Sequence, residues 1–283
     1  MTISTRALPL AVSAALAVSA AIVPAATRAA APASSVSPSA SSAAAVALSP
    51  DALVKRAVAR EALGLEGGHA TITVRVTDAD GGVDAKTLEV WAKKQDGLLR
   101  SRVTFKAPAK IAGMGFLFLQ RAGKGDDQYV YLPAYKKARR VTASERTTSF
   151  AGTDFTYADL EHRATTDATY LRLADETIDK EVCAVIDATP TSAAQSPYAH
   201  VKLWLRTSDD VPLRTQFFDA TGALEKTLFA RKIKIIDGKP IVTEARLERA
   251  GSKRVTEIVV DSVSFTETVG DGVFSMTSFE AGG

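Results

Sequence analysis

The stretch Gly125-Asp-Asp-Gln-Tyr-Val-Tyr-Leu-Pro-Ala-Tyr-Lys-Lys-Ala-Arg-Arg140, continued by Ser149-Phe-Ala-Gly-Thr-Asp-Phe-Thr-Tyr-Ala-Asp-Leu160, decides the fold expected of this chain. Gln128 to Leu132 alternates polar and aromatic residues, which predicts a short β-strand. Pro133 cannot donate to a sheet, so it ends this strand or places it at an edge. The stretch is therefore expected to begin as a β-hairpin.

Two carboxylates precede this strand. Asp126 and Asp127 follow Gly123 and Gly125, and all four residue types favour turns because they tolerate left-handed or locally hydrogen-bonded backbone. Paired carboxylates can also perform acid–base chemistry, but their position after glycine favours a turn.

A basic cluster follows the hairpin and has two interpretations. Lys136, Lys137, Arg139 and Arg140 could protect an edge strand against pairing with another chain. Alternatively, they could form a docking patch for anionic lipid headgroups or a membrane partner, since each basic residue contributes about 1 kcal/mol near an anionic surface.

The second half of the stretch is too aromatic for an ordinary solvated loop. Phe150, Phe155 and Tyr157 surround a Gly-Thr-Asp turn. The nearby Asp154 and Asp159 are expected to cap a short helix or to accept hydrogen bonds from backbone amides, in preference to a catalytic role.

Most of the remaining sequence predicts antiparallel strands. Apolar residues alternate with polar ones between turn signals such as Asp80-Gly81-Gly82, Gln95-Asp96-Gly97 and Asp237-Gly238. About ten strands are expected, with no βαβ rhythm that would indicate a parallel sheet. The predicted strands outside the central stretch lie at residues 71–76, 88–93, 99–105, 116–119, 182–186, 199–206, 213–218, 224–235, 241–249 and 254–265.

One amphipathic helix is expected near the N-terminus. Ser49 is a suitable N-cap, Pro50 suits the first helical position, and Asp51 favours the positive end of the helix dipole. Apolar residues then recur at helical spacing up to Leu63. One helix over many strands predicts a mainly β protein of the α+β type, a large curved antiparallel sheet with the helix packed inside it or across it.

Such a sheet has a concave face that one helix does not fill. It can hold a solid core or an apolar cavity, and strand alternation alone does not separate the two. The candidate cavity residues are the large apolar side chains assigned to the concave face, Met114, Phe116, Phe118, Tyr129, Tyr131, Leu203, Leu205, Phe217 and Phe229.

The N-terminus predicts export. Arg6 precedes an apolar run, Ala7 to Val23, which contains no acidic residue and is shorter than the ~20 residues of a membrane-spanning helix. A cleaved signal is therefore preferred to a retained anchor, and no cysteine lies near the cleavage region to carry a lipid. The expected organisation is a signal peptide (1–30), a disordered Ala/Ser/Pro tether (31–48) and a single folded domain (49–283).

Composition offers few other chemistries. Without residues 1–30, 33 basic face 32 acidic side chains, which argues against a nucleic-acid partner. Cys183 is the only cysteine and is expected in the core. The three histidines, His69, His162 and His200, lack zinc-motif spacing, and His162 is expected to be solvated or a hydrogen-bond partner. No metal, cofactor or catalytic residue is predicted.

The central motif resembles the outer-membrane lipoprotein-sorting family of LolA/LolB-like envelope carriers. The residues that carry the resemblance are Asp126, Asp127, Gln128, Tyr131, Leu132, Pro133, Arg139, Arg140, Phe150, Gly152, Asp154, Phe155 and Tyr157. A second match is Lys202 to Arg206, followed by Pro212 to Thr215 and Phe217. The resemblance spans roughly residues 70–279.

The resemblance implies an unclosed β-barrel that holds acyl chains in an apolar cavity, with helices as a lid. It also implies a periplasmic carrier that is monomeric and non-enzymatic, receives lipid or lipoprotein from an inner-membrane transporter and delivers it to an outer-membrane acceptor. The Ser49 to Leu63 helix and the Phe150 to Leu160 loop are the predicted moving parts. A lipid sensor that signals through a protein partner is the alternative, and an esterase or glycosidase is the least favoured.

Overall fold

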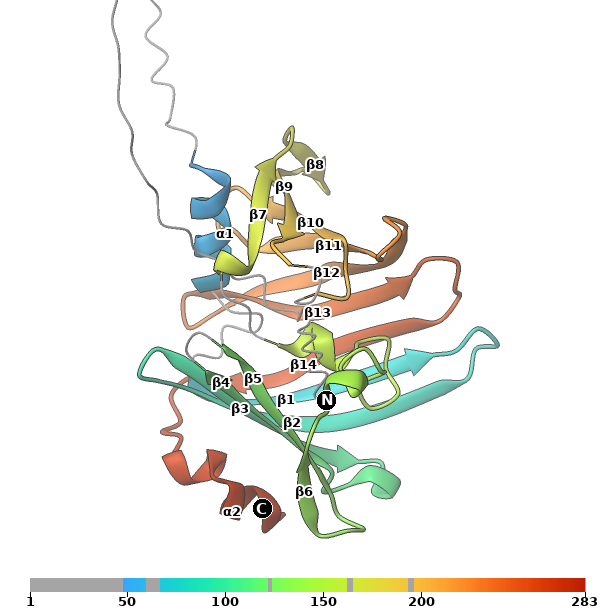
Figure 1. The fold of residues 1–283 in the computed structure, drawn as a ribbon, viewed down its shortest axis with the longest axis vertical. Helices are drawn as coiled ribbons and strands as arrows, with labels where there is room; N and C mark the ends of the chain where they lie inside the picture. The colour runs from blue at the N-terminus through green and yellow to red at the C-terminus, as the bar shows by residue number, and fades with distance from the viewer. Residues whose placement is uncertain (1–47, 60–66, 122–123, 162–164, 193–195, 283) are drawn as a thin grey trace, which may run out of the picture.

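The computed structural model describes residues 48–59, 67–121, 124–161, 165–192 and 196–282 (Figure 1). The predicted signal peptide, nearly all of the tether, and His162 lie outside these residues. None of the described helices is long and apolar enough to cross a membrane.

The described residues form one antiparallel sheet of fourteen strands with two short α-helices. The strands are β1 Gly67–Thr77, β2 Val83–Gln95, β3 Leu98–Ala107, β4 Gly115–Arg121, β5 Lys124–Leu132, β6 Lys137–Arg140, β7 Ala168–Arg172, β8 Glu176–Ile178, β9 Glu181–Pro190, β10 His200–Arg206, β11 Pro212–Phe218, β12 Leu224–Ile236, β13 Lys239–Arg249 and β14 Val255–Ser264, and the helices are α1 Pro50–Ala59 and α2 Met276–Glu280.

The strand order is β6-β5-β4-β3-β2-β1-β14-β13-β12-β11-β10-β9-β7, with β8 paired to β9. Strands β6 and β7 lie at opposite ends of this order, so the sheet is not closed. The predicted fold class, a mainly β unclosed barrel, is confirmed. Of the basic cluster interpreted as an edge strand, Lys137, Arg139 and Arg140 lie in the edge strand β6, whereas Lys136 lies in the turn before it.

The local signals produce the expected elements. The Ser49 hydroxyl accepts a hydrogen bond from the Ala52 amide at 3.2 Å and caps α1. Asp96-Gly97 and Asp237-Gly238 have positive φ at both residues, as two-residue hairpin turns require. The sequence missed β7 and β8, which are mostly exposed or half-exposed and therefore lack a clear apolar alternation.

Side chains on the two faces of the sheet form separate cores. The inner face carries a cluster around Phe105, Phe116 and Phe118, and a second cluster in which α1 packs on β9 to β11. Leu228 contacts both clusters, so the inner core is continuous. The outer face carries one cluster beneath α2, around Leu117 and Phe279, and another around Cys183 and Trp204.

Candidate functional site

The candidate site lies where the loop between β6 and β7 crosses the inner face of the sheet. We call residues 141–161 of this loop the lid loop. Two short 3-10 turns, Ala143–Glu145 and Tyr157–Leu160, give it local structure. Each begins with a reciprocal capping box, formed by Thr142 with Glu145 and by Thr156 with Asp159. The predicted capping role of Asp159 is therefore confirmed.

The lid loop places its aromatic side chains on the inner face. The ring of Phe150 lies 4.4 Å from that of Phe116 on β4 and 5.6 Å from that of Tyr157, between ring centroids. Phe105 on β3 lies 6.0 Å from Phe116. Phe150 and Phe155 are buried, as expected of aromatics too numerous for a solvated loop. In this arrangement the lid loop itself fills the inner face over β3 and β4.

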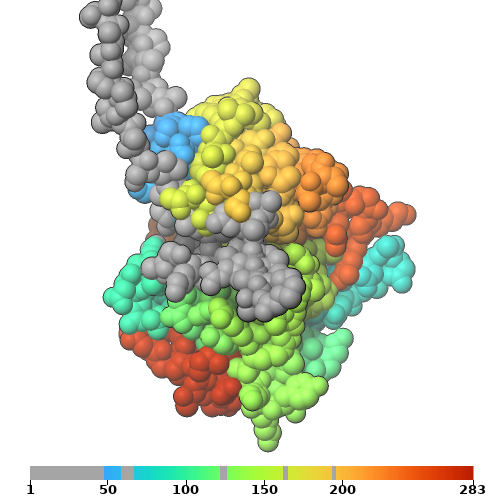
Figure 2. Space-filling model, in the orientation of Figure 1, coloured from blue at the N-terminus to red at the C-terminus, as the bar shows by residue number. Residues whose placement is uncertain are grey.

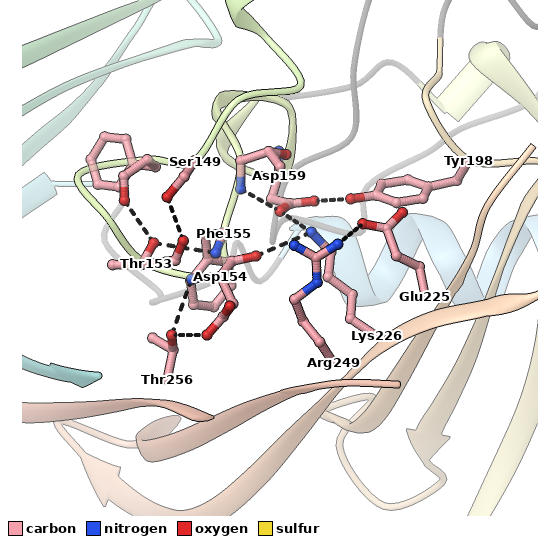
Figure 3. A network of polar contacts seen from close by, with 12 residues as sticks. Ser149, Thr153, Asp154, Phe155, Asp159, Tyr198, Glu225, Lys226, Arg249 and Thr256 are labelled. Carbon is pink, nitrogen blue, oxygen red and sulfur yellow. Dashed lines mark hydrogen bonds and ion pairs between the residues drawn. The ribbon is translucent and has the colours of Figure 1, made fainter. Parts of the chain in front are cut away.

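A buried ion pair holds the other end of the lid loop to the sheet (Figure 3). Lys226 on β12 donates to Asp159 at 2.5 Å, and the two side chains are 1% and 0% exposed. The Tyr198 hydroxyl donates to the other oxygen of Asp159 at 2.6 Å. Burial and the neighbouring Asp159 charge raise the pKa of Tyr198, so this phenol is a permanent donor. Removing one partner of such a pair typically costs about 3–5 kcal/mol.

A second anchor joins the lid loop to β14. The Thr256 hydroxyl donates to the Asp154 carboxylate at 2.7 Å and accepts from the Asp154 amide at 3.1 Å (Figure 3). Asp154 and Thr256 are both buried. Arg254, the residue before β14, donates a hydrogen bond to the Gly152 carbonyl. The Asp154 carboxylate was predicted to accept from a backbone amide. It accepts instead from the Thr256 hydroxyl, so the predicted partner is wrong.

Further contacts fix the loop at its two ends. Arg146 and the buried Glu161 form a partly buried ion pair that closes the loop on itself. The Gln128 amide on β5 donates to the Tyr157 carbonyl at 3.3 Å. The loop is thus fastened to β5 on one side of the open sheet and to β12 and β14 on the other.

Six of the nine predicted cavity residues lie on the inner face, in two groups. Phe116 and Phe118 are core members of the cluster beneath the lid loop, and Met114 packs against it. Leu203, Leu205 and Phe217 belong to the cluster beneath α1.

The inner-face prediction is wrong for Tyr129, Tyr131 and Phe229. Tyr129 and Tyr131 pack in the outer cluster, and the Tyr131 ring lies 6.0 Å from Phe279 of α2. Phe229 is flanked by Arg214, whose guanidinium also lies over Trp204 of the outer face. The cause on β5 is register, since Val130 and Gln128, not the tyrosines, pair with Phe116 and Phe118.

The predicted turn at Asp126 and Asp127 is also wrong. Both lie inside β5, which begins at Lys124. Asp127 forms ion pairs with Arg121 and Arg140, and these pairs satisfy a carboxylate within the strand.

The basic cluster divides into two parts. Arg139 pairs with Glu145 and Arg140 with Asp127, so both arginines serve the fold. Lys136 and Lys137 lie exposed at the β5–β6 hairpin end beside Tyr135, which is 76% exposed. Pro133 ends β5 as expected, and Leu132 is the last residue of that strand.

Cys183 is fully buried in the outer core, as predicted, and burial raises the pKa of its thiol. Within the described residues, no three His, Cys, Asp or Glu side chains gather as metal ligands would.

Comparison with known proteins agrees with this architecture. The sheet is similar to that of a LolA superfamily protein from Nitrosomonas europaea, which has 24% identity, a TM-score of 0.59, and coverage of 74% of this chain and 90% of the other. A family model described as "Uncharacterized protein" matches residues 97–281, more than half of the chain, and the chain belongs to that family. A search of curated proteins gave no match.

Two further solved structures extend the likeness. An outer membrane lipoprotein-sorting protein domain from Vibrio parahaemolyticus has 23% identity and a TM-score of 0.71, covering 75% of this chain and 91% of the other. A DUF1329 family protein from Desulfovibrio piger has 24% identity and a TM-score of 0.72, with coverage of 76% and 91%. The resemblance predicted from the central motif is thereby confirmed at the level of the fold.

The sequence did not reveal three residues that hold the lid loop. Lys226, Tyr198 and Thr256 lie 67, 39 and 102 positions from their lid-loop partners. Strand alternation alone could have placed Lys226 on the inner face, because it lies two residues before the inner-facing Leu228 on β12. A lysine on an apolar strand face requires a buried anion.

Proposed function

We propose that this protein is a periplasmic carrier that binds acyl chains of a lipid or lipoprotein on the inner face of its sheet. One observation carries the proposal: the inner face of an unclosed sheet is filled, over β3 and β4, by Phe150, Phe155 and Tyr157 of a single loop. An acyl chain can take the place of these side chains without any change in the sheet. The fold shared with lipoprotein-sorting and LolA-superfamily structures supports the same function.

The energies permit such an exchange. Each buried CH₂ group contributes about 0.8 kcal/mol, so a chain of about sixteen carbons supplies roughly 12 kcal/mol. Disrupting the buried Lys226–Asp159 pair costs about 3–5 kcal/mol, and uncovering each lid-loop aromatic costs about 1.5–3 kcal/mol, so the gain from the acyl chain is of the same size as the total cost. Binding then needs no covalent chemistry, and we propose no enzymatic activity.

Lys136, Lys137 and Tyr135 are the proposed contact with an anionic membrane or membrane partner. They are exposed at one hairpin end, and tyrosine favours the membrane–water interface. The proposed cycle takes acyl cargo from an inner-membrane transporter and gives it to an outer-membrane acceptor. Charge reversal of both lysines should weaken binding to anionic vesicles, whereas charge reversal of Lys253 should not.

Native mass spectrometry with lipid extraction tests the carrier function on protein purified from a bacterial periplasm. We expect a co-purifying acylated species that decreases when Phe116 is replaced by Asp. Tyr131→Ala is the control, because Tyr131 is also a buried aromatic but lies on the outer face. Circular dichroism establishes that both variants are folded.

A protein that stays free of lipid after incubation with acylated peptide and phospholipid would contradict the proposal. Equal loss of lipid in the Phe116 and Tyr131 variants would contradict the assigned face. A stoichiometric complex with a partner protein that forms only in the presence of lipid would favour the sensor instead.

A further inference from the structure

Lys226 is a cation on the floor of the proposed lipid site. Its ammonium lies 5.4 Å from the ring centroids of both Tyr198 and Phe217. Besides the Asp159 carboxylate, the ammonium donates to the Asp154 carbonyl at 3.4 Å. Both acceptors belong to the lid loop. The sheet therefore presents a lysine beside the rings of Tyr198 and Phe217, and the lid loop supplies its oxygen acceptors (Figure 3).

Lifting the lid loop takes both oxygens away from Lys226. A buried ammonium without a counter-ion is strongly unfavourable, whereas a carboxylate or phosphate that replaces Asp159 restores the pair. A neutral amphiphile offers the same apolar chain but no anion. The inner face thus distinguishes ligands by headgroup charge as well as by chain length.

We infer that the ligand of this site is a long-chain amphiphile with an anionic headgroup, which binds Lys226 in the place that the Asp159 carboxylate holds in the closed form. The inference rests on the proposed function and specifies its ligand. In this arrangement Asp159 acts as an internal competitor of the ligand. The Tyr198 hydroxyl, released from Asp159, provides a second donor to the same anion.

The other cation of this strand pair provides a control. Arg249 on β13 pairs in register with Lys226, but its side chain is 49% exposed and bonds Glu225 at 3.4 Å. Arg249 lies close to Lys226 in Figure 3, but its hydrogen bond goes to Glu225 and not to Asp159. A headgroup effect that depends on burial should therefore require Lys226 and not Arg249.

Calorimetric titration of the purified, delipidated protein with laurate, dodecyl phosphate and lauryl alcohol tests the inference. These probes share one chain, and the two anions distinguish a carboxylate from a phosphate headgroup. We expect at least one anion to bind about tenfold or more tightly than the alcohol. Asp159→Asn should strengthen binding of the anions by a larger factor than binding of the alcohol, because it loosens the lid loop for every probe but frees Lys226 for an anion only.

Removal of the cation should remove the preference. Lys226→Met alone leaves Asp159 buried and unpaired, so the variant that tests this is Lys226→Met with Asp159→Leu, which replaces the whole pair by apolar groups. It should bind alcohol and anions equally, and Arg249→Met should retain the wild-type preference.

Equal binding of alcohol and anions by the wild-type protein would overturn the inference and leave the carrier proposal intact. Loss of the preference in Arg249→Met, with retention in the Lys226 and Asp159 double variant, would also overturn it. Failure of all three probes and of phospholipid to bind would count against the proposed function itself.

Discussion

Lys226 and Asp159 form a fully buried ion pair between the sheet and the loop that crosses it. The pair lies on the inner face, close to Thr256 and Asp154, which form the second anchor of the same loop. Aromatic packing and polar anchoring thus alternate along one segment, with Asp154 next to Phe155 and Asp159 two residues after Tyr157. The closed arrangement is held by contacts that a single event, displacement of the lid loop, breaks together.

Breaking the ion pair from one side should destabilise the protein strongly. Asp159→Ala leaves the Lys226 ammonium buried without its carboxylate, and we expect a loss of about 3–5 kcal/mol in the free energy of unfolding. Urea denaturation followed by circular dichroism measures it. Arg249→Ala, which breaks an exposed pair with Glu225, should cost at most about 1 kcal/mol.

The double variant Lys226→Met with Asp159→Leu checks the cause. Apolar replacement of both partners should recover most of the lost stability, because the desolvated charges are gone. If the double variant is as unstable as Asp159→Ala, the pair is not the source of the effect.

Truncating the lid-loop aromatic Phe150 should loosen the loop without unfolding the sheet. Phe150→Ala removes contacts with Phe116, Phe105 and Tyr157, for an expected cost of about 3–5 kcal/mol. Under the carrier proposal the same change uncovers the inner face, so the amount of co-purifying lipid should rise. Limited proteolysis should cut the variant first within residues 141–161. Unchanged lipid content with a destabilised loop would separate the lid loop from binding.

The sequence predicted elements that local rules control. The N-cap at Ser49, the hairpin turns at Asp96 and Asp237, and the edge position of residues 137–140 depend on neighbours within a few positions. The central motif also predicted that Phe150 and Phe155 are buried.

The faces of β5 were not predictable in this way. Tyr129, Val130 and Tyr131 are consecutive apolar residues because the lid loop covers one face of this strand and α2 covers the other. Alternation is then lost, and only the partner register identifies the inner face. Lys226 and Asp159 illustrate the same limit, since nothing local connects two residues 67 positions apart.

The thiol of Cys183 should become reactive only on global unfolding and not on local opening of the lid loop. Its side chain is fully buried in the outer core, and burial raises the pKa of the thiol, so both access and thiolate formation are suppressed. We expect labelling by a thiol reagent at neutral pH to follow the global unfolding rate. Because the outer core is separate from the lid loop, Phe150→Ala should increase labelling no more than its loss of stability requires. Rapid labelling of the folded wild-type protein would contradict this burial.

Acid should weaken the junction between β6 and the lid loop through Glu145. Hydrogen bonds from Arg139 and Thr142 lower the pKa of Glu145 from 4.5 to about 2. Because the folded pKa is depressed, the contribution of Glu145 to stability is complete above pH 4.5 and is lost as the pH falls towards 2. The stability difference between wild type and Glu145→Gln, measured by urea denaturation at several pH values, should therefore be largest near neutral pH and shrink between pH 4.5 and pH 2.

A control variant, Arg139→Gln, removes the main cause of the pKa shift. In that background, Glu145→Gln should have a smaller effect on stability, with little pH dependence. A difference between wild type and Glu145→Gln that stays constant from pH 7 to pH 2.5 would show that the Arg139–Glu145 pair does not stabilise this junction.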